Sequence, residues 1–211
     1  MATDIRGQGT KFRISTAEGS PIVITGISKA NPAVVTANNT LAAQDIIYTG
    51  EVVGMTEVNG RAFVVASPTG TSFQLKGIDS TGYNTYVSGG TAKKQTMTDV
   101  GNVKSFDGFD GEADEIDVTD FDSVAKEFGL GLQDFGSISM EIGLDSSNAG
   151  QSAMLAAKNA GSAKVFTITL RNGLVAAFVG FVKSFSVSAA PNNTVRGRAS
   201  IRITGLPTFF V

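Results

Sequence analysis

The feature that most constrains the fold of this chain of 211 residues is a period of two in its apolar residues. Every second residue from Ile138 to Leu144 is large and apolar, and the residues between them are Ser, Glu or Gly. Ala199, Ile201 and Ile203 alternate with polar residues in the same way. Successive side chains of a strand point to opposite faces, so such runs predict strands with one buried and one solvated face. We therefore expect a mainly β protein.

Two Asn-Gly pairs and a helix-favouring segment interrupt these runs. Asn59-Gly60 predicts a two-residue hairpin turn, because both residue types tolerate positive φ, and Asn172-Gly173 predicts a second hairpin turn. Residues 147–161 predict the one helix, which Ser147 or Asn148 can cap at its start and Gly161 can end.

Composition divides the chain into two parts. Residues 19–92 hold all three tyrosines and only two of the 14 phenylalanines, and short strand-like runs alternate there with turn signals. We expect this segment to be a small all-β domain inserted into a larger domain made of residues 1–18 and 93–211. Residues 17–21 are expected to end the first strand, and residues 91–101 to be the linker that returns to the larger domain.

The absent residue types restrict the possible chemistry. The chain has no cysteine and no histidine, so it cannot form a disulfide, a thiolate zinc site or a Ser–His catalytic pair. The longest apolar run, residues 174–182, is too short to cross a membrane, and residues 1–12 contain no signal-peptide core. We expect a protein made in the cytoplasm that is no enzyme and has no cofactor, metal or membrane contact.

Acidic residues are concentrated in one stretch. Residues 107–127 contain nine carboxylates and one base, a charge of −8, which leaves 10 acids and 16 bases, or +6, for the rest of the chain. A solvated loop is the ordinary interpretation of such a run. A calcium site is a weaker one, because the spacing does not match an EF-hand loop. Docking on the basic surface of another copy, or repulsion of DNA phosphates, are further possibilities.

The C-terminal tail and one arginine-bearing strand face allow two interpretations each. Phe209, Phe210 and Val211 either fold back on their own subunit or dock on a neighbour, because exposed aromatic residues at a chain end are unfavourable. The face that carries Arg196, Arg198 and Arg202 lacks the interleaved aromatic residues of a nucleic-acid site, so a polar sheet face or a subunit contact is favoured.

Several motifs, taken in order, resemble a known family. They are GTKFRIST (9–16), DEIDVTDFDS (114–123), GLQDFGSISMEI (131–142) and IRITGLPTF (201–209). Over residues 5–18 and about 95–211, the chain is similar to the tail tube (major tail) proteins of long, non-contractile-tailed bacteriophages.

The resemblance implies a β-sandwich or barrel with one flanking helix. It also implies rings of six subunits, which stack into a tube with an electronegative lumen through which DNA passes without specific binding. Partners would be other copies, the tape-measure protein, the tail terminator and the distal tail proteins, within a virion tail assembled in the host cytoplasm. Residues 19–92 resemble a small β domain that recurs in phage proteins and is similar to one in ubiquitin-activating enzymes. We expect this domain on the outer surface of the tube, without an activity.

The same resemblance implies the contact residues. The acidic stretch corresponds to the family's long loop between core strands and is expected to reach a neighbouring subunit. The predicted contact residues of the loop are Asp107, Asp110, Asp114, Glu115, Asp117, Asp120, Phe121 and Phe128. Their predicted basic partners are Arg6, Lys11, Arg13, Arg196 and Arg202, and the C-terminal arm is Phe209, Phe210 and Val211.

Two other functions were weighed. In a decoration or adhesion protein, the insert would bind a cell-surface glycan, with Tyr83 and Tyr86 stacking on sugars. In a carboxylate–metal hydrolase, activity would depend on Asp110, Asp114 and Asp117.

Overall fold

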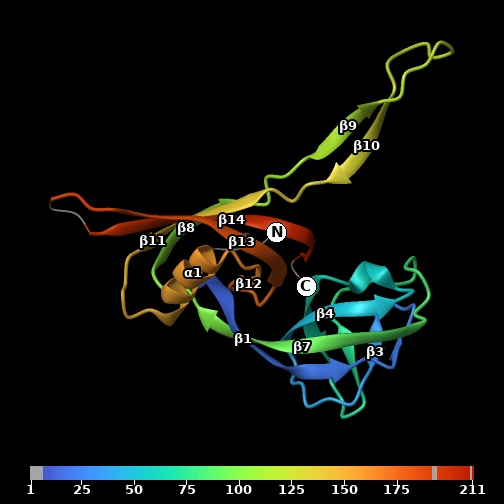
Figure 1. Ribbon diagram of the computed structural model, residues 1–211, viewed down its shortest axis with the longest axis horizontal. Coiled ribbons are helices and arrows are strands. Elements are labelled where there is room, and N and C mark those ends of the chain that lie inside the picture. The colour runs from blue at the N-terminus through green and yellow to red at the C-terminus, as the bar shows by residue number, and fades with distance from the viewer. Residues whose placement is uncertain (1–6, 192–193, 210) are drawn as a thin grey trace, which may run out of the picture.

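The computed structural model describes residues 7–191, 194–209 and 211, and these residues form a mainly β protein with one α-helix (Figure 1). The helix α1 spans Ala149–Ala160, and a 3₁₀ turn spans Thr56–Val58. The strands are β1 (Lys11–Val23), β2 (Gly26–Ile27), β3 (Val34–Thr36), β4 (Ile46–Val53), β5 (Arg61–Ala66), β6 (Ser72–Leu75), β7 (Ser88–Asp99), β8 (Val103–Gly108), β9 (Ala113–Asp117), β10 (Phe128–Gln133), β11 (Ser137–Gly143), β12 (Lys164–Thr169), β13 (Val175–Ser188) and β14 (Arg196–Thr208).

Twelve of these strands form one continuous ladder, in the order β2-β3-β6-β5-β4-β7-β1-β12-β13-β14-β11-β8. The ladder folds into two modules, each with its own buried cluster. The core module comprises α1, the first half of β1, β8 and β11–β14. The insert module comprises β2–β6 together with the second half of β1 and β7, and lies at the lower right of Figure 1.

The core module is a sandwich because two parts of the ladder face each other across one apolar cluster. The polar layer consists of β8, β11, β14 and residues 181–188 of β13. It turns Ile138, Met140, Ile142, Ala199, Ile201 and Ile203 inward. The covered layer consists of β1, β12 and residues 175–180 of β13, and it turns Phe12, Ile14, Phe166, Ile168 and Phe178 toward the same cluster. The two outer faces of the sandwich therefore point in opposite directions.

The predicted helix is confirmed. Asn148 caps it, and its side chain accepts a hydrogen bond from the Gln151 backbone N–H at 2.9 Å. Gly161 ends it with φ 59°, a left-handed conformation that glycine adopts without a Cβ penalty. Met154 and Ala157 lie on the buried face of the helix and pack against the core cluster.

The two predicted hairpin turns have different outcomes. Asn172-Gly173 does connect β12 to β13, and the Leu170 and Leu174 backbones are hydrogen-bonded across the turn. Asn59-Gly60 does not form a two-residue turn, because the residues before it form the 3₁₀ turn and β4 ends at Val53. The Asn59 side chain instead bonds to both the N–H and the C=O of Val52, at 2.9 and 2.8 Å.

The expected break at residues 17–21 and the expected linker at 91–101 are also wrong. β1 continues through the first segment to Val23, and most of the second belongs to β7. The two strands pair along their length, with register shifts at Ser15/Ala17 and Glu18/Pro21. These irregularities accommodate residues of low strand propensity, including a proline that cannot donate to the ladder. β1 and β7 thus connect the modules as one sheet.

A third buried cluster joins the modules. Ile46, Ala62 and Val64 of the insert pack against the outer face of the covered layer, where Val165, Val175, Ala177 and Val179 are buried. The insert therefore lies on the side of the sandwich opposite to the exposed face of the polar layer. It is a packed part of the molecule, since apolar burial on this scale opposes independent movement.

Candidate assembly surfaces

Six of the nine carboxylates of the acidic stretch lie on a projecting ribbon, which we call the arm (residues 113–133). Its strands β9 and β10 pair antiparallel, with Glu115 opposite Leu130 and Asp117 opposite Phe128. Figure 1 shows the arm extending away from both modules. The sequence predicted a loop here, and the structure shows a two-stranded ribbon of β9 and β10 with residues 118–127 as its tip. An isolated two-stranded ribbon is at best marginally stable in water, so a projecting arm of this kind is suited to docking on another surface.

Large apolar side chains are exposed along the arm. The side chains of Phe121 and Val124, near the tip, are fully exposed, and Leu132 is 89 % exposed. The other exposed apolar residues of the arm are Ile116, Val118, Phe128 and Leu130. An apolar surface of this kind on a soluble domain marks an interaction site. Only Phe121 and Phe128 were predicted, because the alternation of Phe128, Leu130 and Leu132 with glycines is a strand signal that does not distinguish an exposed side chain from a buried one.

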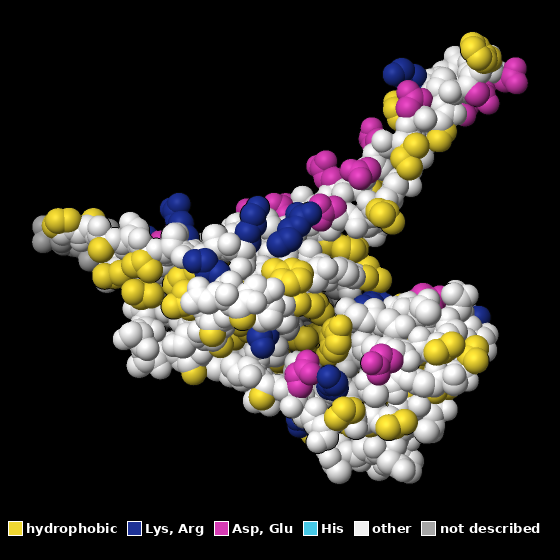
Figure 2. All heavy atoms as spheres, viewed as in Figure 1, with side chains coloured by type: hydrophobic (Ala, Val, Ile, Leu, Met, Phe, Trp, Pro, Cys, Tyr) yellow, Lys and Arg dark blue, Asp and Glu magenta, His cyan; other side chains and the backbone are white. Residues whose placement is uncertain are grey.

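The arm acids Asp114, Glu115, Asp117 and Asp120 are all exposed, and Figure 2 shows acidic side chains along one side of the arm. Within the described residues, the only ion pair of the arm joins Lys126 to Asp117 at 3.7 Å. Hydrogen bonds from the Thr119 hydroxyl and backbone N–H, and secondarily from Lys126, lower the pKa of Asp117. The other acids of the arm have no ion-pair partner among the described residues.

A tight crossing, which we call the neck (residues 109–112 and 134–136), joins the arm to the core module. Gly111 and Gly136 lie so close that a Cβ on Gly111 would stand 2.3 Å from the Gly136 nitrogen. The Asp110 carboxylate, a predicted loop residue, accepts a hydrogen bond from the Ser137 N–H at 2.8 Å. Asp134 accepts one from the Gly136 N–H and forms an ion pair with Arg202. These bonds, the Gly136 N–H first, lower the pKa of Asp134.

The predicted basic residues have acidic partners within their own chain. Lys11 and Arg13 contact Asp99, at 3.9 and 2.5 Å. Arg196 contacts Glu141 at 2.5 Å, and Arg202 contacts Asp134. Arg6 lies outside the described residues. An exposed ion pair contributes only about 0–1 kcal/mol, so these bases can exchange partners when another subunit approaches. Their pairing with a neighbour's arm stays a prediction.

The exposed face of the polar layer is rich in hydroxyl groups. The cross-strand rows Asp107–Ser139–Ser200–Ser184 and Ser105–Glu141–Arg198–Ser186 run across four strands. The predicted loop residue Asp107 thus lies on a core strand of this face. The charges of Arg196, Arg198 and Arg202 are offset by Asp107 and Glu141 on the same face and by Asp134 at the neck.

Both edges of the polar layer are open in the described part of the chain. β8 pairs only with β11, and β13 has no partner on its second edge beyond Gly180. Every neighbouring pair in this four-stranded layer is antiparallel. β8 therefore runs antiparallel to β13. Unpaired edges are templates for strand addition.

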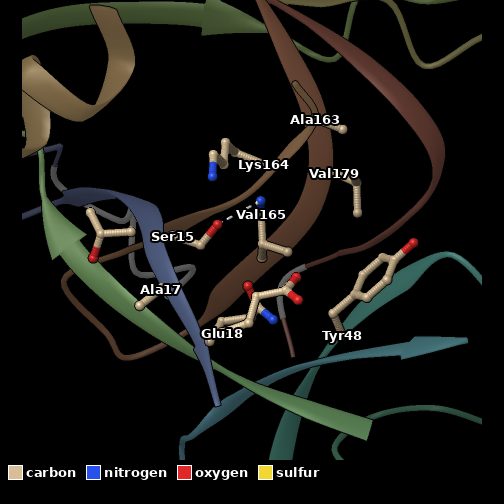
Figure 3. Close-up of a pocket in the computed structure, with 10 residues that line it drawn as sticks. Ser15, Ala17, Glu18, Tyr48, Ala163, Lys164, Val165 and Val179 are labelled. Carbon is tan, nitrogen blue, oxygen red and sulfur yellow. Dashed lines mark hydrogen bonds between the residues drawn. The ribbon is translucent and has the colours of Figure 1, made fainter. Parts of the chain in front are cut away.

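A cleft of about 330 Å³ lies where the two modules meet, and Ser15, Glu18, Tyr48, Lys164 and Val179 line it. Figure 3 shows Glu18 and Tyr48 on one side of it and Lys164 on the other. The Ser15 hydroxyl accepts a hydrogen bond from the Val165 N–H at 3.0 Å, and Glu18 is paired with Lys93. These side chains fasten β1 to β12 and β7, which gives them a structural role.

The residues of the two other candidate functions lie elsewhere. Within the described residues, no group of three acids is close enough to hold a metal ion, and Asp110 is separated from Asp117 by the length of β9. The half-buried Tyr83 accepts a hydrogen bond from Arg61, at 3.1 Å. Tyr86 donates to the carbonyls of Ile24 and Gly89, at 3.0 Å each. No described helix is long and apolar enough to span a membrane.

The described part of the C-terminal tail folds back on its own subunit. Phe209 packs on Phe109 and Phe135, with ring centroids 5.1 and 6.2 Å apart, and remains 43 % exposed. Val211 forms two backbone hydrogen bonds with Val175 of β13. Phe210 lies outside the described residues. Of the two alternatives for the tail, the structure thus shows the intramolecular one for Phe209 and Val211.

Comparison with known proteins gives one result. Residues 76–177, just under half of the chain, match the family described as phage tail tube, TTP, lambda-like. The matched range contains β7, the arm, β11, α1 and β12. No curated protein sequence matches the chain. The family match supports a structural protein of the bacteriophage tail tube.

Proposed function

We propose that this chain is the major structural protein of a long, non-contractile bacteriophage tail. Its copies form rings, the rings stack into a hollow tube, and DNA passes through the lumen during ejection. The match to the tail tube family and the mainly β sandwich with one helix support this function. Rings of six subunits, assembly in the host cytoplasm and contacts with tape-measure, terminator and distal tail proteins follow from the resemblance alone.

The observation that carries the proposal is the arm. It exposes seven large apolar side chains beside a row of exposed carboxylates, on a ribbon joined to the core module by a hydrogen-bonded neck. Exposure of these apolar side chains does not stabilise a free subunit. Docking on a second copy would bury the apolar side of the arm and place its acids next to arginines of that copy. Because the contact is repeated at every subunit, ion pairs that are individually weak are sufficient to hold the assembly together.

The even number of antiparallel strands in the polar layer supports closure into a ring. Because the polar layer has four antiparallel strands, β8 of one copy can pair antiparallel with the open edge of β13 on the next. Each copy then adds the same four strands, and closed repetition removes every exposed edge. This interface is head-to-tail. Such an interface gives a closed ring when the rotation from one copy to the next is a whole fraction of a full turn.

The two outer faces of the sandwich support an orientation in the tube. We place the polar layer at the lumen and the insert, packed on the opposite side, on the outer surface. Hydroxyl groups and offset charges hold DNA phosphates weakly, because retention depends on uncompensated Lys and Arg. The resemblance implies an electronegative lumen, and we therefore expect the negative electrostatic potential of this face to be weak. The likeness of the insert to the domain of ubiquitin-activating enzymes stays a prediction.

The test combines microscopy with labelling. Negative-stain electron microscopy of the concentrated protein is expected to show rings or hollow tubes with knobs outside. The chain has no cysteine, so Ser139→Cys and Lys29→Cys give one thiol each, on the polar layer and on the insert. In assembled tubes, a bulky maleimide should label the insert thiol and not the polar-layer thiol. Monodisperse particles that never assemble on added tail-tip complexes would contradict the function, and the reverse labelling would contradict the orientation.

A further inference from the structure

The C-terminal segment (residues 206–209 and 211) contacts all three parts of the molecule. Figure 1 shows the C-terminus between the insert and the core module. Thr208 pairs with Ala177 of β13, and Val211 exchanges backbone hydrogen bonds with Val175, at 3.0 and 3.2 Å. The segment is thus bound to the core strand that also carries the third cluster. The remaining contacts of the segment reach the insert and the neck.

Toward the insert, the segment satisfies a buried cation. Arg61 is only 5 % exposed, and no carboxylate of the described residues lies within ion-pair distance of it. Its guanidinium donates to the backbone carbonyls of Leu206 and Pro207, at 3.2 and 3.5 Å. Within the insert it donates to the Glu57 backbone carbonyl and to the Tyr83 hydroxyl. A buried charge without such acceptors is strongly unfavourable, so the insert requires these carbonyls in place.

Two further contacts fix the same junction. The Thr208 hydroxyl donates to the Ala62 carbonyl at 2.8 Å, and both groups are buried. The Val211 side chain lies over Gly77, where a Cβ would stand 2.4 Å from its Cγ1. These contacts leave little freedom for the insert to tilt against the core module.

Toward the neck, the segment supports the base of the arm. Phe209 packs on Phe109 and Phe135, one on each side of the neck, and Phe109 also packs on Phe178 in the core, with ring centroids 5.6 Å apart. Phe109 has φ 63°, a left-handed conformation that costs a bulky residue about 1–2 kcal/mol. Such a conformation persists when surrounding contacts hold it, and Phe209 supplies one of them.

We propose that the C-terminal segment is a brace, which fixes the direction of the arm and the position of the insert relative to the core module before the subunit meets another copy. Phe209 is the positioning residue for the arm, and Arg61 and Val211 fasten the insert. Pre-orientation lowers the ordering cost of docking, so the brace favours productive contacts between copies. This last consequence rests on the proposed function, whereas the brace itself is a property of the single subunit.

The test measures distances in dispersed subunits. The cysteine-free chain accepts a spin-label pair at Val124→Cys on the arm tip and Lys158→Cys on α1, both exposed. We expect Phe209→Ala to broaden the distance distribution of this pair and to remove its single peak. Phe181→Ala is the matched control, because this phenylalanine of β13 is 40 % exposed against 43 % for Phe209 and, within the described residues, its ring contacts neither Phe109 nor Phe135.

A second pair reports on the insert. Labels at Lys29→Cys and Lys158→Cys should keep a narrow distribution in Phe209→Ala and broaden when Val211 is deleted. Circular dichroism shows whether each variant is folded. An unchanged arm distribution in folded Phe209→Ala, or equal broadening in Phe181→Ala, would overturn the brace. If the unsubstituted chain never forms tubes, the proposed function is wrong. The distance distributions of the dispersed subunit still show whether the C-terminal segment acts as a brace.

Discussion

Gly77 of the insert lies directly beneath Val211, and a Cβ at Gly77 would stand 2.4 Å from the Val211 Cγ1. Two residues that lie 134 positions apart in the sequence are therefore packed without room for a methyl group. Gly77 also has φ 67°, so a glycine at this position permits both the left-handed backbone conformation and the close approach of Val211.

Gly77→Ala is expected to lower the free energy of unfolding by about 1–3 kcal/mol, the usual cost of overpacking, in addition to the cost of the left-handed conformation. Gly60→Ala is the matched control, because Gly60 has φ 70° and no atom within 4 Å of its Cβ position. Urea unfolding followed by circular dichroism measures both. Equal losses in the two variants would show that the Val211 contact contributes nothing.

Charge reversal on the arm tests the predicted contact between subunits. Asp114→Lys with Glu115→Lys should abolish tube formation and leave the unfolding midpoint unchanged, since neither acid has an ion-pair partner within the described residues. Glu51→Lys with Asp79→Lys makes the same charge change on the exposed surface of the insert. Sedimentation and electron microscopy score assembly. Tubes from the arm variant, in the yield of the insert variant, would exclude an electrostatic role of these acids.

Substitution of an exposed apolar residue at the tip of the arm should affect tube assembly without affecting the stability of the subunit. Phe121→Ser should change the free energy of unfolding by no more than about 0.5 kcal/mol, because the side chain is fully exposed in the subunit. The same change should raise the protein concentration needed for tube growth, since it removes apolar surface that docking would bury. Val87→Ser, on the 67 % exposed Val87 of the insert, is the control. Growth at an unaltered concentration would place Phe121 outside the contact.

The neck should respond to acid. The Gly136 N–H and Arg202 lower the pKa of Asp134 below the usual value of about 3.9. The carboxylate therefore stabilises the neck fully above that value, and the contribution is lost as the pH falls through the lowered pKa. Carboxyl-carbon NMR of Asp134 should show a midpoint below 3.9, and Arg202→Gln should raise it. A midpoint that Arg202→Gln leaves unchanged would assign the whole shift to the Gly136 hydrogen bond.

The acidic stretch shows how far the sequence predicted the candidate site. Its concentration of charge marked residues 107–127 as a surface feature, and the arm acids are indeed exposed. The apolar side of the arm was missed beyond Phe121 and Phe128, because exposed Leu130 and Leu132 follow the same alternation as a buried strand. The phenylalanines around the neck carry no local signal at all, since Phe209 meets Phe109 only through the fold.

Elements that have local causes could be predicted from the sequence alone. The alternation from Ile138 to Leu144, the Asn148 cap, the Gly161 end and the Asn172-Gly173 turn each act within a few residues, and each is present in the structure.

The way these elements join depends on contacts between segments that are distant in the sequence. β1 runs through Gly19 and Pro21 because β7 pairs with it, and β7 forms a strand because β1 and β4 lie on either side. The burial of Arg61 beneath the carbonyls of Leu206 and Pro207 joins residues 145 and 146 positions apart. Local propensity differs by less than about 1 kcal/mol per residue, so pairing and burial that involve distant segments override it.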